Sequence, residues 1–64
     1  MEIMNVEEAA DYVRLGTSTL NRFRVTGGGP RYAKLGGAVR YRKADLDAWI
    51  AGRVVRSTSE AHAA

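Results

Sequence analysis

The order of elements in this chain follows from residues 16–42, which have the sequence GTSTLNRFRVTGGGPRYAKLGGAVRYR. Leu20 and Phe23 lie three residues apart, which predicts the buried ridge of a short helix over Thr17–Val25. On a helical wheel, the opposite side carries three polar side chains, Ser18, Asn21 and Arg22. Such a face suits the major groove of DNA, although an ordinary solvent-exposed helix has the same pattern.

The glycine-rich loop over residues 26–30 ends this helix, because three glycines and Pro30 cannot continue it. A phosphate-binding loop is an alternative interpretation of the glycines. That loop needs Gly-Lys-Ser/Thr at the start of a helix, whereas Gly29 is followed by Pro30-Arg31-Tyr32. We therefore do not expect nucleotide binding here.

Two short strands are predicted after the loop, Arg31–Leu35 and Ala38–Arg42, joined by Gly36-Gly37. A Gly-Gly pair favours a two-residue type I′ turn, in which both central residues need positive φ. The two runs therefore predict a β-hairpin.

The two faces of the second strand differ in chemistry. Val39 and Tyr41 share one face and can pack on the helices, while Arg40 and Arg42 face outward, with Lys34 near the hairpin tip. A charged outer face also discourages edge-to-edge aggregation, so a purely structural role for these charges stays open.

A helix is predicted on the N-terminal side over Val6–Leu15. Its apolar stripe is spaced as in an amphipathic helix and consists of Val6, Ala9, Ala10 and Val13. Asn5 and Glu8 have the spacing of a capping box, in which each side chain accepts a hydrogen bond from the other residue's backbone.

Another helix is predicted on the C-terminal side over Lys43–Gly52, with the apolar stripe Leu46, Trp49 and Ile50. Trp49 is expected to anchor the core rather than to stack on a nucleic-acid base. Asp45 and Asp47 lie in the first turn, where the helix dipole favours them. We expect residues 1–52 to form the domain and residues 53–64 a disordered tail, within which Val54-Val55 leaves open a short extension or a contact strip for a partner.

Charge is distributed unevenly along the chain, although the net charge is only +3. The segment between Asp11 and Asp45 contains no acid and eight bases: Arg14, Arg22, Arg24, Arg31, Lys34, Arg40, Arg42 and Lys43. Clustered bases of this kind indicate a polyanionic partner.

Several classes of protein are disfavoured by the composition. The chain has no cysteine and one histidine, His62, so we expect neither a conventional zinc site nor another cofactor. One terminal histidine cannot build a Ser/His/acid catalytic set, so we do not expect an enzyme. Residues 1–6 do not resemble a signal peptide, and no run approaches the about 20 apolar residues of a membrane helix. We therefore expect a cytoplasmic location and no membrane partner.

The succession of helix, turn, helix, glycine-proline loop, basic hairpin and helix is that of a winged helix-turn-helix. We therefore expect a mainly α fold with a small β-hairpin that binds double-stranded DNA through the second helix and the hairpin wing.

The residues that fill this order resemble the excisionase/AlpA-like family of small phage and prophage proteins, whose fold is related to that of MerR-type DNA-binding domains. The similar segments are VEEAADY at 6–12, STL at 18–20 with Arg22-Phe23, GPRY at 29–32 with KLG at 34–36, VRYR at 39–42 and DLDAWI at 45–50. Together they cover roughly residues 3–52. The resemblance implies a non-catalytic architectural factor that binds repeated sites near an attachment site, bends the DNA, contacts a tyrosine or serine integrase and favours excision.

Position by position, the resemblance implies a recognition helix over Thr17–Arg24 and a wing over Lys34–Arg42. The DNA-binding residues expected on the helix are Thr17, Ser18, Thr19, Asn21, Arg22 and Arg24, and those on the loop and wing are Arg31, Lys34, Arg40 and Arg42. The chain departs from many relatives at Gly16, where a serine cap is common, and at Asn21, where an aromatic residue or a larger base is common. The family's sequence preference therefore cannot be transferred.

One recognition helix and one wing bury only about 600–1,000 Å² of protein surface on DNA. We therefore expect several copies to bind adjacent sites cooperatively. Two other functions stay open from the sequence. One is an AlpA-like transcription regulator with the same fold, and the other is a protein-interaction or antitoxin-like module whose basic face meets an acidic protein.

Overall fold

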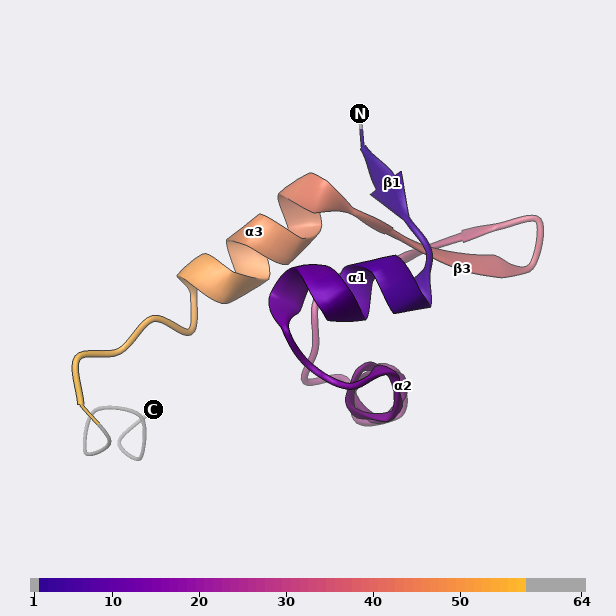
Figure 1. Ribbon diagram of the computed structural model, residues 1–64. Helices are drawn as coiled ribbons and strands as arrows, with labels where there is room; N and C mark the ends of the chain where they lie inside the picture. The colour runs from indigo at the N-terminus through magenta and orange to yellow at the C-terminus, as the bar shows by residue number, and fades with distance from the viewer. Residues whose placement is uncertain (1, 58–64) are drawn as a thin grey trace.

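The computed structural model describes residues 2–57. The elements are β1 (Ile3–Met4), α1 (Val6–Val13), α2 (Thr17–Thr26), β2 (Ala33–Leu35), β3 (Ala38–Arg42) and α3 (Lys43–Ala51) (Figure 1). This arrangement of helices and a three-stranded antiparallel sheet confirms the expected winged helix-turn-helix. The predicted tail beyond residue 57, with His62, lies outside the described residues.

The sheet has the strand order β1-β3-β2, with β3 in the middle. Strand β1 was not predicted: it pairs Met4 with Tyr41 and Ile3 with Arg42. A two-residue strand has no periodic pattern of its own, so only its partner reveals it. The β2–β3 hairpin extends away from the helices (Figure 1).

The hairpin turn has the backbone that the sequence predicts. Gly36 and Gly37 adopt φ of 61° and 91°, the left-handed conformation that a type I′ turn requires at both positions. Strand β2 begins at Ala33 rather than Arg31, because the segment after Pro30 passes α2 before it pairs with β3.

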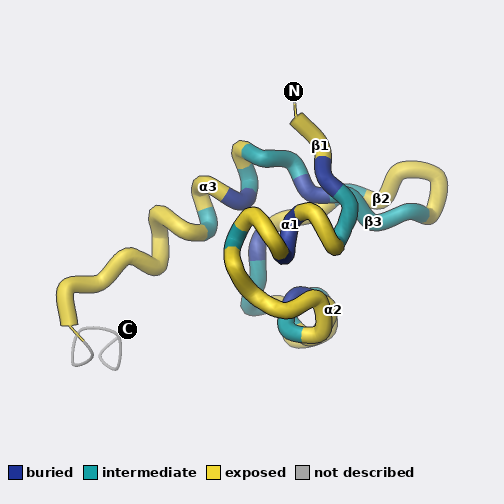
Figure 2. Tube along the Cα trace, in the orientation of Figure 1, coloured by how far each residue is buried: buried dark blue, intermediate teal, exposed yellow. Residues whose placement is uncertain are grey.

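The core lies where the three helices meet strands β1 and β3 (Figure 2). Tyr41, Leu20 and Leu46 are its largest fully buried side chains. The predicted stripe of α3 is only partly buried: Trp49 is half-buried at the edge of the core and Ile50 is 38% exposed. The centre that Trp49 was expected to occupy is filled by Tyr41 from β3.

Helix α1 begins as predicted. The Glu8 backbone N–H donates to Asn5 Oδ1 at 2.8 Å, and the Asn5 N–H donates to Glu8 Oε1 at 2.9 Å, which completes the capping box. The helix ends at Val13, two residues before the predicted Leu15, because Arg14 adopts the left-handed φ of 62°. The Leu15 N–H then donates a hydrogen bond to the Ala10 carbonyl at 2.9 Å, and the chain turns toward α2.

The glycine loop after α2 passes against Phe23. A Cβ on Gly29 would lie 2.5 Å from Phe23 Cβ, closer than two carbons can approach, whereas one on Gly28 would come no nearer than 3.7 Å. Gly29 therefore permits the close packing of the loop on α2.

We expect Gly29→Ala to destabilise the protein by about 1–3 kcal/mol, because the added methyl group forces Phe23 or the loop to move. Gly28→Ala is the matched control and should be neutral or slightly stabilising, since it adds an ordinary contact and restricts the unfolded chain. Urea unfolding followed by circular dichroism measures both changes. Equal effects of the two substitutions would contradict this account of the loop.

Candidate nucleic-acid interface

The outer face of α2 carries the polar side chains that the sequence places there. Leu20 is fully buried and Phe23 packs on the core, so the opposite side of the helix faces solvent. Thr17, Ser18, Asn21 and Arg22 are exposed, and Thr19 is half-buried. The structure thus brings the exposed members of the predicted recognition set together on one helix face.

Val25 lies on this same face and is 88% exposed. It is not among the DNA-binding residues predicted from the sequence, all of which are polar or charged. The signal was present: Val25 follows Ser18 by seven residues and Arg22 by three, which places the three on one side of a helix.

The hairpin presents its bases on two different faces. Lys34 pairs across the strands with Val39, and Ala33 pairs with Arg40, so Lys34 and Arg40 lie on opposite faces. Lys34 is exposed near the tip. Arg40 is half-buried and its Nη1 donates to the Val39 carbonyl at 2.7 Å. Between them, these two residues give both faces of the hairpin positive charge.

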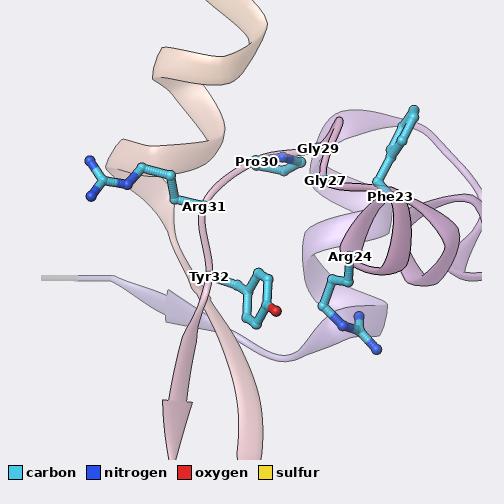
Figure 3. A pocket seen from close by; sticks show the side chains of 7 residues that line it. All are labelled: Phe23, Arg24, Gly27, Gly29, Pro30, Arg31 and Tyr32. Carbon is cyan, nitrogen blue, oxygen red and sulfur yellow. The ribbon is translucent and has the colours of Figure 1, made fainter.

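A cleft of about 310 Å³ separates α2 from the segment that leads into β2. Arg24 and Tyr32 point toward each other across it, and Arg31 points away from them (Figure 3). The guanidinium carbon of Arg24 lies 5.9 Å from the centre of the Tyr32 ring, and Nη1 donates to the Tyr41 hydroxyl oxygen at 3.3 Å. Arg24 thus belongs partly to the packing between helix and hairpin, whereas Arg31 is exposed.

Arg42 has a partner of its own on α3. Its Nε and Nη2 donate to the two carboxylate oxygens of Asp45 at 2.6 and 2.7 Å, a bidentate ion pair. Hydrogen bonds from Arg42 lower the pKa of Asp45 below its usual value, against the opposing effect of desolvation. The predicted phosphate contact of Arg42 therefore competes with this pair.

The carbonyl of Gly28, in the loop after α2, accepts two hydrogen bonds from the C-terminal part of the domain. Trp49 Nε1 donates to it at 3.2 Å and Arg53 Nη2 at 2.5 Å. The Arg53 guanidinium carbon also lies 4.9 Å from the centre of the Trp49 ring, and Trp49 meets Phe23 edge-on at 5.7 Å. These contacts hold the C-terminal end of α2 against α3.

A second polar contact joins α1 to α3. The Tyr12 hydroxyl donates to Asp47 Oδ1 at 2.5 Å, and Lys43 Nζ lies 3.4 Å from Asp47 Oδ2. The hydrogen bond from Tyr12 lowers the pKa of Asp47 and raises the pKa of Tyr12 itself. Asp45 and Asp47 thus each neutralise a base at the start of α3. Only Asp45 lies in the first turn of the helix, where the dipole effect was expected for both.

A family of helix-turn-helix domains matches residues 3–54 of the chain. The match spans all the helices and strands described above. The chain belongs to this family. It is a domain that binds double-stranded DNA, in agreement with the exposed polar face of α2 and the basic hairpin. No curated protein matches the sequence.

Two further properties concern the residues that the structure describes. Among residues 2–57, no three His, Cys, Asp or Glu side chains lie close enough together to hold a metal ion. None of the helices in this part of the chain has the length and hydropathy needed to cross a membrane.

The Arg42–Asp45 pair predicts a pH dependence of stability. Because the folded-state pKa of Asp45 is lowered, the pair stabilises the fold above the unfolded-state pKa of about 3.9 and loses this effect as pH falls through the folded-state value. We expect Asp45→Asn to lower stability at pH 7 and to weaken its decline between pH 5 and pH 2.5. Some decline should remain, because the pKa of Asp47 is lowered as well.

Urea unfolding across this pH range measures the effect, and Arg42→Gln is the complementary variant. It removes the hydrogen-bond donor to Asp45 and should also make the free energy of unfolding fall less steeply as the pH is lowered. If the free energy of unfolding falls as steeply with pH in Asp45→Asn as in the unmodified protein, the pair contributes no pH-dependent stability.

Proposed function

We propose that the protein is a phage or prophage excisionase, an architectural DNA-binding protein that directs an integrase toward excision. The observation that carries the DNA-binding part is the exposed face of α2 together with a separate cationic hairpin. The resemblance of the sequence to the excisionase/AlpA-like family supports the role in recombination.

In this proposal, α2 enters the major groove and the hairpin contacts a neighbouring minor groove or the phosphate backbone. Asn21 can form paired hydrogen bonds to adenine and Arg22 to guanine, each discriminating against other bases by about 1–3 kcal/mol. Thr17, Ser18 and Thr19 line the same end of the helix, where hydroxyl groups and backbone N–H groups suit phosphate oxygens.

The bases differ in how freely they can reach phosphates. Arg22, Arg31 and Lys34 are exposed, and Arg40 is half-buried with only a backbone hydrogen bond. Arg42 is engaged by Asp45, and Arg24 by Tyr41. Because Arg22 is assigned to guanine, we assign most of the phosphate contacts to Arg31, Lys34 and Arg40.

Three phosphate contacts predict that the logarithm of the binding constant falls with the logarithm of salt concentration at a slope of about −2.7. Arg31→Gln and Lys34→Gln should each reduce the magnitude of the slope by about 0.9. Arg42→Gln is the matched control and should leave the slope nearly unchanged. Fluorescence anisotropy with labelled duplex DNA measures these slopes, and an equal reduction in all three variants would contradict the assignment.

The small contact surface also predicts cooperative binding. One module buries too little surface to bind tightly as a monomer, so several copies are expected on adjacent sites, with bending of the DNA. Strict one-to-one binding to an attachment-site fragment would contradict this part of the proposal.

The role in recombination is tested by excision in vitro with the cognate integrase, with and without the protein. We expect the protein to increase the yield of excised product, and Arg22→Gln to reduce that increase because it weakens DNA binding. If the protein binds the attachment site while excision does not respond, the excisionase proposal is wrong. The AlpA-like regulator is then the better assignment. Weak, salt-insensitive binding to duplex DNA would instead favour a protein partner.

A further inference from the structure

We propose that Val25 contacts the C5-methyl group of a thymine in the major groove and thereby helps to select the target sequence. This inference rests on the proposed insertion of α2 into the groove. It adds a determinant of base preference to the hydrogen-bonding side chains of Asn21 and Arg22.

The geometry of α2 places Val25 at the centre of the exposed face. With about 100° of rotation per residue, Val25 projects between Asn21 and Arg22 and lies about 20° from the direction of Ser18. Its direction is nearly opposite to the midpoint of Leu20 and Phe23, the two side chains that pack inward. A groove that follows this face of α2 can therefore reach Val25 as well as Asn21 and Arg22, since Val25 lies about one turn beyond Asn21 toward the C-terminal end of the helix.

The fold does not account for a valine at this position. At 88% exposure it has the largest exposed fraction among the large hydrophobic residues in the described part of the chain. Valine is also a poorer helix former than alanine or the long polar residues, because its branched Cβ restricts the side chain. Its exposed methyl groups gain free energy only when another surface covers them.

The major groove offers one apolar group for this purpose. Among the base edges exposed there, only thymine presents a methyl group, and apolar side chains are its natural contacts. Asn21 and Arg22 can take adenine and guanine on either side of Val25, so the three side chains together would read a short mixed sequence. The occupant that the chemistry favours is therefore a thymine next to the bases read by Asn21 and Arg22.

The test is a double-mutant cycle between the protein and the DNA. Duplexes that bind the full chain are first selected from a random pool, and each thymine of the selected site is then replaced by deoxyuridine, which lacks only the methyl group. Burial of one such group corresponds to about 0.8 kcal/mol, or about a fourfold change in affinity. Dissociation constants are measured for the unmodified protein and for Val25→Ala.

At one thymine we expect deoxyuridine to weaken binding of the unmodified protein about fourfold, and to weaken binding of Val25→Ala by much less. Val25→Ala should itself bind the thymine duplex several-fold more weakly, while the salt dependence stays unchanged. Loss of the fold cannot explain such a result, because alanine favours the helix more than valine does. Circular dichroism verifies this directly.

Val54→Ala is the matched control, since Val54 is 74% exposed and lies outside α2. It should show the full deoxyuridine effect. If Val25→Ala and deoxyuridine weaken binding independently at every thymine, so that their fold-changes in the dissociation constant multiply, the inference is wrong while DNA binding stands. The same holds if the selected sites contain no preferred thymine. If the protein selects no duplex at all, the proposed function itself fails, and this inference with it.

Discussion

The side chain of Tyr41 is the contact on which the arrangement of this small domain depends. It is fully buried on the central strand β3, beside Met4 of β1 across the sheet, and its ring lies 6.2 Å from that of Tyr32. Its hydroxyl accepts a hydrogen bond from Arg24 of α2. One residue therefore joins the N-terminal strand, the hairpin and α2. Because β3 continues directly into α3 at Lys43, the same strand also sets the direction of the last helix.

Helix α2 is held at its C-terminal end by contacts that leave its outer face free. Gly29 packs against Phe23, and the Gly28 carbonyl accepts hydrogen bonds from Trp49 and Arg53. These contacts lie on the loop and on the inward side of α2. A domain with so small a core gains rigidity from such polar and aromatic contacts, since rigid elements position a binding surface better than mobile ones. Arg53 lies beyond the predicted domain boundary at residue 52, so the contacts of the domain reach at least that residue.

The sequence predicted those features that depend on neighbours along the chain. The capping box at Asn5, the type I′ turn at Gly36-Gly37 and the inward-facing Tyr41 follow from local chemistry or periodicity, and the structure has all three. Features that depend on distant partners were missed. Strand β1 exists only because β3 lies beside it, and the hydrogen bond from Tyr12 to Asp47 joins residues 35 positions apart in the chain. The same limit applies to the site, because the sequence shows which residues are basic but not which bases already have acidic partners.

Those partnerships matter more to the interface than the net charge of +3 does. Asp45 and Asp47 sit beside the bases at the start of α3, Arg42 and Lys43, and neutralise them within the fold. No acidic residue occurs between residues 12 and 44, so the bases of α2 and of most of the hairpin have no carboxylate near them in the sequence. Positive potential is therefore concentrated on α2 and the β2–β3 hairpin, because nearby opposite charges cancel while isolated ones project into solvent. A modest total charge, distributed in this way, is enough to orient a small domain on a polyanion.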